Sequence, residues 1–298
     1  MCGIVGLFAK NPAIEAELGA HLATMLAALA ERGPDSAGFA VYAPGAPETM
    51  KFTLRQPDGA DPDELLARLG IPESSIRRRG SHVVLTVPAN QHGPARAALD
   101  EVAPETAVVG CGMRMELYKE IGRPADVARR FALPAMHGSH GIGHTRMATE
   151  SAVTTAGAHP FSTGPDQCLV HNGSLSNHNA LRRELQRRGH AFATENDTEV
   201  AAVYLTARMR EGLSLGDALR GALHDLDGFY TFVVGTADGF AVLRDPIACK
   251  PAVLAETDDY VAFGTEYRAL AALPGIAAAR VWEPEPATVY AWDRGSRA

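Results

Sequence analysis

Strand-like segments that follow one another with only a tight turn between them constrain the fold more than any other feature of this sequence. Phe229–Gly235 and Phe240–Arg244 are two such apolar segments, joined by Thr236-Ala237-Asp238-Gly239. An Asp-Gly step between apolar segments is typical of a β-hairpin, whose strands are antiparallel. Parallel strands need a long crossover instead. We therefore predict a mainly antiparallel α+β fold and not a doubly wound parallel sheet.

Apolar residues recur along the rest of the chain with the spacing of helices or strands. Ile14, Leu18, Leu22 and Leu29 repeat at helical intervals before Gly33-Pro34, which ends the pattern. Further strands are predicted at 4–8, 39–42, 140–145, 167–171, 252–255, 260–264 and 287–292, and further helices at 177–188, 198–211, 214–224 and 266–272.

Residues 45–135 differ in texture from the segments on either side. Short strand-like runs alternate there with helical patterns, and polar joints rich in Gly and Pro separate them. We therefore predict one domain, residues 1–298, that carries a small α+β insertion with its own partial core over 45–135. Within it, Arg77-Arg78-Arg79 is interpreted as a solvated turn.

The composition excludes several classes of protein. The chain has 298 residues, 46% of them hydrophobic, so it buries enough apolar surface to fold without disulfide or metal staples. A net charge of −7 argues against a general nucleic-acid binder, which needs a basic face. No apolar run approaches the roughly 18 residues of a membrane span, and the N-terminus lacks the basic region of a signal peptide. We expect a cytoplasmic protein.

Cysteine usage singles out one residue. The four cysteines, at positions 2, 111, 168 and 249, form no CxxC pair, so neither a zinc knuckle nor a thioredoxin-like motif is predicted. If Met1 is removed, Cys2 carries a free α-amine, with a reference pKa of about 7.7–8.0, beside a thiol of about 8.5. One residue would then supply both nucleophile and base. Its position alone equally fits a cysteine that simply begins a buried strand.

Several polar segments accompany Cys2 along the chain. Each alone has an ordinary structural explanation: Gly33 ends a helix, Asn172-Gly173 forms a turn, and Asp197 caps a helix. The segments are Arg32–Gly38, Gly141–Thr149, Ala158–Phe161, His171–Leu175 and Asn196–Glu199, followed by Arg244-Asp245-Pro246 and Gly264-Thr265-Glu266.

In this order behind Met-Cys-Gly-Ile-Val-Gly, the segments resemble the class II glutamine amidotransferase domain, an N-terminal-nucleophile (Ntn) hydrolase. The resemblance covers residues 1–42 and 136–292. It implies an αββα four-layer sandwich, in which two antiparallel sheets are stacked between helix layers. The hairpins described above agree with this fold.

The resemblance implies roles for the residues that match the family's motifs. Cys2 would attack the side-chain amide of glutamine to give a γ-glutamyl thioester and ammonia, and water would then release glutamate. Asn172 and the backbone N–H of Gly173 match the pair that stabilises the oxyanion. Arg32 matches a motif that packs near the nucleophile and is assigned a supporting role.

Three further positions match substrate-binding residues. Arg146 would hold the α-carboxylate of glutamine, a task suited to a planar guanidinium. Asp197 would pair with the α-ammonium, and Thr149 would line the same loop. After Thr149 the sequence runs Glu150-Ser151-Ala152-Val153, where the synthase members have His-Gly, so the loop that covers the substrate differs here.

The runs His-Thr-Arg-Met-Ala-Thr-Glu-Ser and Ala-Cys-Lys-Pro look most like separate amidotransferase subunits of glutamate synthase-like and N-methylglutamate synthase-like enzymes. This implies L-glutamine as substrate and an ammonia-accepting synthase subunit as partner, with the insertion as candidate docking surface. Any flavin would belong to that partner, and this chain is expected to hold no cofactor.

The same resemblance leaves two other functions open: a catalytically silent structural subunit, and an Ntn hydrolase of another amide. The joint presence of Cys2, Arg146, Asn172 and Asp197 argues against the silent subunit. Arg146 and Asp197 together match the two charged ends of an amino acid, which argues against another amide.

The histidines at 137, 140 and 144 have a spacing that resembles a metal-ligand set. Glycines at 138, 141 and 143 make a helix improbable there, so we interpret the segment as the Gly-rich start of a strand and predict no metal site.

Overall fold

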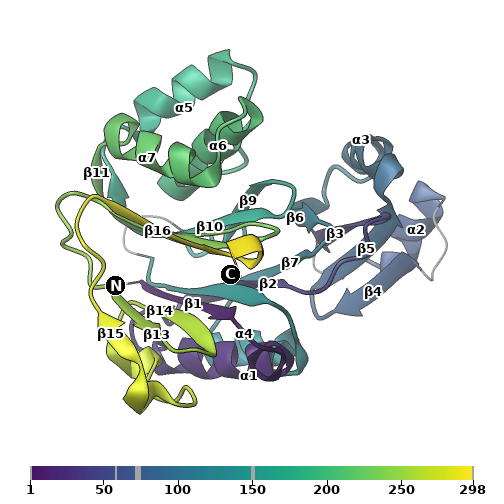
Figure 1. Cartoon of the computed structure of the whole chain (residues 1–298). Helices are drawn as coiled ribbons and strands as arrows, with labels where there is room; N and C mark the ends of the chain where they lie inside the picture. The colour runs from purple at the N-terminus through teal and green to yellow at the C-terminus, as the bar shows by residue number, and fades with distance from the viewer. Residues whose placement is uncertain (1, 58, 71–74, 149–151, 297–298) are drawn as a thin grey trace.

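Two antiparallel sheets lie face to face at the centre of the molecule, with helices on the outer face of each (Figure 1). The computed structural model describes residues 2–57, 59–70, 75–148 and 152–296. The sheets and the helices outside them form the αββα four-layer sandwich, so the predicted fold class is confirmed.

The larger sheet has seven strands, and each neighbouring pair is antiparallel. Its order is β15 (Arg280–Trp282), β13 (Val253–Glu256), β14 (Tyr260–Gly264), β1 (Gly3–Ala9), β8 (His140–Arg146), β2 (Ser36–Tyr42) and β7 (Met115–Ile121).

The second sheet has five strands and contains the predicted hairpin. Val233 pairs with Val242 in the antiparallel register that the Asp-Gly turn indicates. The order is β16 (Thr288–Asp293), β12 (Gly239–Arg244), β11 (Gly228–Gly235), β10 (Gln167–Leu175) and β9 (Phe161–Gly164).

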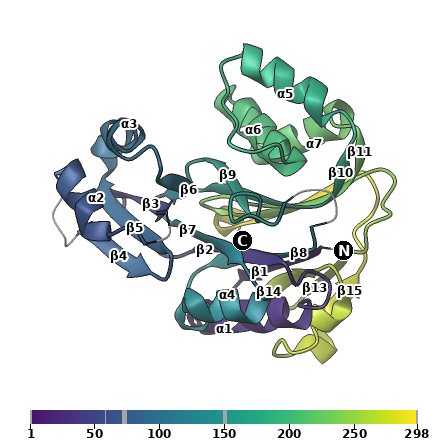
Figure 2. The ribbon, with the colours of Figure 1, turned by 180° about the vertical axis from the view of Figure 1, so that it is seen from behind.

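Helices cover the outer face of each sheet. Views from both sides place one group of helices below the larger sheet and another above the smaller one (Figure 2). The first group is α1 (Pro12–Ala28) and α4 (Pro124–Arg130), and the second is α5 (His178–Arg187), α6 (Asp197–Arg210) and α7 (Leu215–Asp225).

Helix α1 lies close to the larger sheet because β8 presents glycines to it. A Cβ at Gly143 would lie 2.9 Å from the Leu26 side chain, and one at Gly141 would lie 3.0 Å from Leu22. The helix begins where Asn11 accepts a hydrogen bond from the Ile14 N–H at 3.0 Å. The glycines that argued against a helix at 138–143 thus serve close packing of a helix on a strand.

The core between the sheets is apolar. Ile4 and Phe8 of β1 belong to the same buried cluster as Val170 and Val233 of the smaller sheet. This packing places the start of β1 beside β10 of the other sheet, and this contact between the sheets positions the site.

The insertion forms a third sheet beside the sandwich, with four strands and two helices (Figure 1). Its own core includes Phe52, Leu54, Leu85 and Leu99. The elements are β3 (Thr49–Arg55), α2 (Pro62–Leu69), β4 (Ile76–Arg79), β5 (His82–Pro88), α3 (His92–Val102) and β6 (Ala107–Gly112). We call residues 49–112 the insert.

Two segments within the expected range 45–135 pack with the main body. Strand β7 pairs with β2 in the larger sheet, and Val127 and Phe131, in and after α4, join the cluster around α1. The chain therefore re-enters the main sheet directly after the insert.

Two local predictions were wrong. Arg77–Arg79 belongs to strand β4, paired with β5, and is not a turn. Glu116 binds Arg77 and Asp63 binds Arg78. The helix expected at 266–272 is only a short 3₁₀ turn over Tyr267–Ala269.

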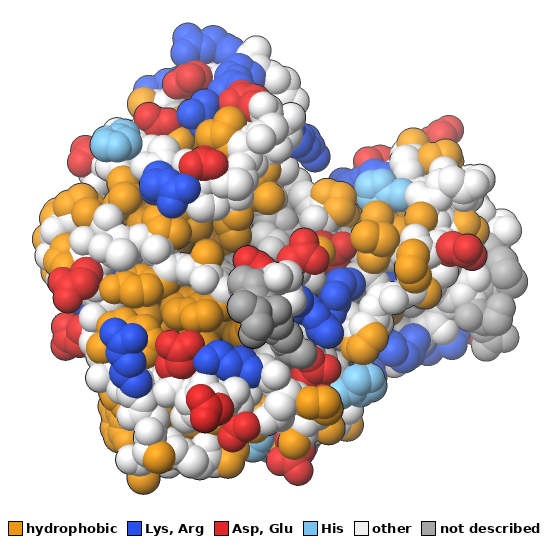
Figure 3. Space-filling model, viewed as in Figure 1, with side chains coloured by type: hydrophobic (Ala, Val, Ile, Leu, Met, Phe, Trp, Pro, Cys, Tyr) orange, Lys and Arg blue, Asp and Glu red, His pale blue; other side chains and the backbone are white. Residues whose placement is uncertain are grey.

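One face of the molecule is notably apolar. Figure 3 shows hydrophobic side chains gathered over the region between the two sheets, with charged side chains around them. Tyr290 and Trp292 of β16 stack with ring centroids 6.1 Å apart, and Trp282 of β15 lies 6.3 Å from Tyr290.

Within the described ranges, no helix is long and apolar enough to cross a membrane.

Candidate active site

Cys2 lies directly before β1, at one end of the larger sheet. Strand register pairs Gly3 with Thr145 and Ser36 with Arg146, so the start of β1, the end of β8 and the start of β2 meet there. The Cys2 side chain is partly exposed, and its Sγ lies 3.9 Å from the Met147 carbonyl oxygen.

Two side chains hold the backbone of Cys2. Arg32 Nε donates to the Cys2 carbonyl oxygen at 3.1 Å, and Asn172 Nδ2 donates to the same oxygen at 3.4 Å. Arg32 is itself paired with Glu266. The Ile4 N–H donates to the Thr265 hydroxyl at 2.8 Å. These contacts fix the start of β1 between segments that lie far apart in the sequence.

Gly173 occupies a position that excludes a side chain. Its φ is +149°, and a Cβ there would lie 2.0 Å from the Phe229 carbonyl oxygen and 2.7 Å from Tyr230 Cα. Only glycine fits this backbone conformation without a shift. Residues 172 and 173 lie in β10, paired with β11, so they form part of a strand and not a turn.

Arg146 ends β8 and is buried, with only 6% of the residue exposed. Its carbonyl oxygen accepts from the Asp35 N–H at 3.1 Å, and the Asp35 carboxylate accepts from the Ala148 N–H at 2.8 Å. Gly157 lies beside the guanidinium, since a Cβ there would be in van der Waals contact with Arg146 Nη1 at 3.4 Å.

Asp197 begins α6 and stays ionised. Burial alone would raise the pKa of this carboxyl group, but His171, 3.7 Å away, and the Leu175 N–H, at 3.0 Å, lower it to about 2. The N-terminal end of a helix also favours a negative charge. Asp197 is therefore a fixed anion near neutral pH.

Next to Asp197 in the sequence, the hydroxyl of Thr198 contacts two histidines for which the sequence motifs indicated no role. Thr198 Oγ1 lies 2.8 Å from His159 Nε2 and 2.9 Å from His171 Nδ1. His144 stacks on His159 with centroids 4.1 Å apart and contacts the His171 carbonyl oxygen at 3.0 Å. Burial lowers the pKa of His144 to about 3, so this ring is neutral.

The three histidines considered as metal ligands do not converge. His140 stacks on Tyr42 and contacts the Thr236 carbonyl oxygen at 2.8 Å, whereas His144 contacts His171. Among the residues that the structure describes, no group of three His, Cys, Asp or Glu side chains could hold a metal ion.

The structure thus brings Cys2, Arg32 and Asn172 into direct contact, with Gly173 next to Asn172. Arg146 joins them through the strand register. Thr149 lies outside the described residues.

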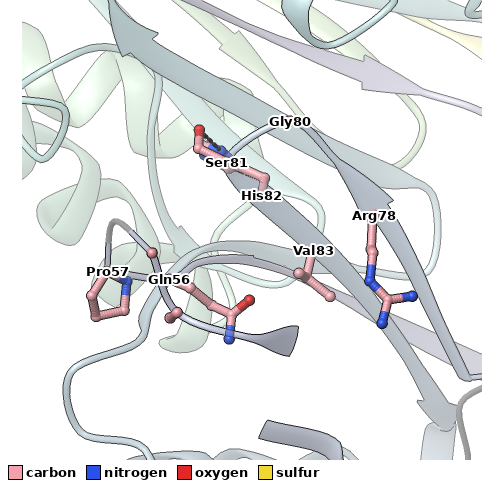
Figure 4. Close-up of a pocket in the computed structure, with 9 residues that line it drawn as sticks. Gln56, Pro57, Arg78, Gly80, Ser81, His82 and Val83 are labelled. Carbon is pink, nitrogen blue, oxygen red and sulfur yellow. Dashed lines mark hydrogen bonds between the residues drawn. The ribbon is translucent and has the colours of Figure 1, made fainter. Parts of the chain in front are cut away.

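A cavity of about 370 Å³ lies elsewhere, on the insert. Figure 4 shows Ser81, His82 and Arg78 among its lining residues, and none of the predicted site residues lines it. We assign this cavity no role in the site.

Comparisons with known proteins agree with the geometry. A glutamine amidotransferase domain model matches residues 144–272. The glutamine amidotransferase-like protein GlxB of Rhizobium meliloti (strain 1021) is 60% identical over 297 residues, 98% of each chain. A protein of Methanothermobacter thermautotrophicus is 33% identical over 291 residues, which cover 89% of this chain and 92% of the relative.

A solved structure shows the same fold. The glutamine phosphoribosylpyrophosphate amidotransferase from B. subtilis, complexed with ADP and GMP, matches with a TM-score of 0.64 and 20% identity. The match covers 99% of this chain and 48% of that one. Sequence identity over nearly the whole length, together with this sandwich, identifies the chain as a member of the class II glutamine amidotransferase family.

Proposed function

We propose that this chain is a glutaminase subunit whose nucleophile is Cys2. The observation that supports the proposal best is the contact of Asn172 Nδ2 with the Cys2 carbonyl oxygen, because it puts a strong hydrogen-bond donor beside the cysteine. Removal of Met1 would leave the α-amine of Cys2 as the base for its own thiol.

The proposed reaction has two stages. The α-amine accepts the thiol proton, and Sγ attacks the δ-carbon of the glutamine side chain. The tetrahedral oxyanion accepts hydrogen bonds from Asn172 Nδ2 and the Gly173 N–H. Collapse breaks the C–N bond, the amine returns the proton to the leaving group, and ammonia departs. Water then attacks the γ-glutamyl thioester and forms a second tetrahedral oxyanion. Its collapse breaks the C–S bond and releases glutamate and the thiol.

Two fixed charges support free glutamine as the substrate. Arg146 would bind the α-carboxylate through two parallel hydrogen bonds, and the ionised Asp197 would bind the α-ammonium. A substrate amide that lacks one of these charged groups would forgo one of the two proposed interactions, so free glutamine is the substrate that satisfies both. Thr149 is proposed as a third substrate-binding residue.

We further propose that a separate synthase subunit, glutamate synthase-like or N-methylglutamate synthase-like, receives the ammonia. The insert, which has a core of its own beside the sandwich, is the proposed docking element. A pull-down from native cells, with the partners identified by mass, tests this. Replacing the insert, residues 49–112, with a Gly/Ser linker should abolish any rise in turnover on assembly, and this deletion leaves β7 and α4 in place.

Cysteine substitutions test the nucleophile. We expect Cys2→Ala to abolish glutamate release and Cys2→Ser nearly to abolish it, while both variants still fold. The matched control is Cys249→Ala, because Cys249 is also a free cysteine and is exposed. Mass spectrometry should find Met1 absent from the active protein, and a glutamine-like diazoketone should label Cys2.

Turnover assays and mass spectrometry also separate the alternative functions. A wild-type chain that turns over no glutamine even when assembled with its partners would indicate the silent structural subunit. Turnover of another amide in preference to glutamine would indicate a different Ntn hydrolase. A fully active protein that retains Met1 would overturn the proposed base.

A further inference from the structure

Two adjacent buried side chains on β7, Lys119 and Glu120, form hydrogen bonds with residues 154–158, a segment beside the proposed glutamine site. Each residue is only 5% exposed. Strand β7 is the element by which the chain returns from the insert to the main sheet. Neither side chain has a part in the proposed chemistry, so their burial calls for another explanation.

The side chain of Lys119 binds the backbone of this segment. Nζ donates to the Ala158 carbonyl oxygen at 2.9 Å and to the Ala156 carbonyl oxygen at 3.1 Å. It also lies 4.4 Å from the centre of the Phe161 ring. Burial, with a smaller effect of the positive charge of Arg146, lowers the pKa of Lys119 to about 7, although Glu199 acts in the opposite direction. An amine and an ammonium both donate N–H groups, so this grip does not need a full charge.

Glu120 binds the same segment through a side chain. One carboxylate oxygen accepts a hydrogen bond from the Thr155 hydroxyl, and the other accepts from the Ser81 hydroxyl at 2.7 Å. Burial alone would raise the pKa of Glu120, but these two hydrogen bonds lower it below its usual value. Ser81 lies between β4 and β5, so this carboxylate connects the insert to the segment.

The gripped segment, residues 154–158, lies against Arg146. The Gly157 N–H donates to Thr154 Oγ1 at 3.1 Å, and the Ala158 N–H donates to the Thr155 carbonyl oxygen at 3.2 Å, which gives a compact turn. Gly157 packs beside Arg146 Nη1, as described above. A movement of this turn therefore changes the space around the guanidinium.

We propose that Lys119 and Glu120 are positioning residues that hold the 154–158 turn against Arg146, with Ser81 of the insert as the support behind Glu120. The insert is then part of the framework of the glutamine site as well as a candidate docking element. This inference rests on the proposed function, since it assigns the turn a task in glutamine binding.

Glu120→Gln and Thr155→Val test the hydrogen bond between these two residues by changing each partner in turn. We expect each to raise KM for glutamine about tenfold with kcat nearly unchanged, because a hydrogen bond to a charged group is lost and Cys2 is untouched. Glu120 also contacts Ser81, Arg55 and Arg130, whereas Thr155→Val removes the Thr155 contact alone. The double variant should therefore be no worse than Glu120→Gln by itself. Lys119→Met should likewise raise KM.

Glu116→Gln is the matched control. Glu116 is a buried carboxylate on the same strand, and it binds Lys51 Nζ at 3.1 Å and Arg77 in the insert. Among the contacts of the described residues, it makes none with the 154–158 turn. Glu116→Gln should leave KM for glutamine within about twofold of wild type.

Covalent labelling of Cys2 separates positioning from general damage. Iodoacetamide needs only the thiol, whereas the glutamine-like diazoketone also needs the amino-acid subsite. We expect Glu120→Gln and Lys119→Met to slow labelling of Cys2 by the diazoketone about tenfold and to leave the iodoacetamide rate unchanged, with both rates measured on the Cys2 peptide.

Two results would overturn the inference. One is an unchanged KM in both Glu120→Gln and Lys119→Met. The other is an equal rise in KM in Glu116→Gln, or equal slowing of both labels, either of which would show a general loss of structure. Failure of the proposed function looks different, because Cys2→Ala would then retain glutaminase activity.

Discussion

Replacement of Gly173 by alanine tests whether the backbone of β10 supplies part of the catalytic machinery. A Cβ at this position would lie 2.0 Å from the Phe229 carbonyl oxygen, whereas real Cβ contacts are essentially never shorter than 3.0 Å. The strands β10 and β11 must therefore separate by about 1 Å (3.0 − 2.0) at this point. Misplacement of a catalytic group by 1 Å costs about 10²-fold in rate, so we expect kcat for glutamine to fall at least about 100-fold.

The same substitution should also lower stability. A residue with a side chain at a φ of +149° stores about 1–3 kcal/mol of backbone strain. We expect the free energy of unfolding, measured in urea, to fall by about that amount while the protein remains folded.

The control for Gly173→Ala is Gly93→Ala. Gly93 lies in α3, where a Cβ would meet no atom within 4 Å. This change should leave kcat unaltered and stabilise the protein by about 0.4–1 kcal/mol, because alanine loses less backbone entropy on folding. If Gly173→Ala kept a kcat within about twofold of wild type, Gly173 would not hold an oxyanion donor in place.

Three further substitutions address the proposed roles one by one. Arg146→Lys should raise KM for glutamine despite the retained charge, because an ammonium cannot make the two parallel hydrogen bonds of a guanidinium; steady-state kinetics with a thermal melt as folding control measures this. Asn172→Ala should lower kcat by about 10²–10³ and leave KM nearly unchanged, and a change in KM alone would contradict an oxyanion role. Asp197→Asn should raise KM at every pH from 5 to 8. Since the pKa of Asp197 lies near 2, the wild-type carboxylate stays ionised across that interval and adds no rise in KM as the pH falls; a wild-type KM in Asp197→Asn would remove this residue from the ammonium subsite.

The sequence predicted those features that depend on neighbours along the chain. The hairpin that pairs Val233 with Val242 follows from an Asp-Gly turn between two apolar segments, and helix α1 follows from its apolar spacing and from Asn11. The meeting of Cys2 with Asn172 depends on the packing of two sheets, and only the family resemblance predicted it.

The features that the sequence did not reveal depend on contacts between distant segments. Lys119 and Glu120 sit in an ordinary strand pattern, and nothing near them in the sequence marks their contacts with residues 155–158. Thr198 stood within a recognised segment, but its place between two histidine rings arises only when α6 packs on β10. Arg77–Arg79 forms a strand by pairing with β5, and the contact of Arg77 with Glu116, 39 positions away, cannot be read from the residues around it.

The place of β1 in the larger sheet governs when the proposed site can first exist during synthesis of the chain. Strand β1 is made first, yet it lies between β8, which ends at Arg146, and β14, which ends at Gly264. Thr265 then binds Ile4, and Glu266 binds Arg32, which holds Cys2. A ribosome must therefore translate past residue 266 before the surroundings of Cys2 are complete, so the proposed site can form only after most of the chain has been made.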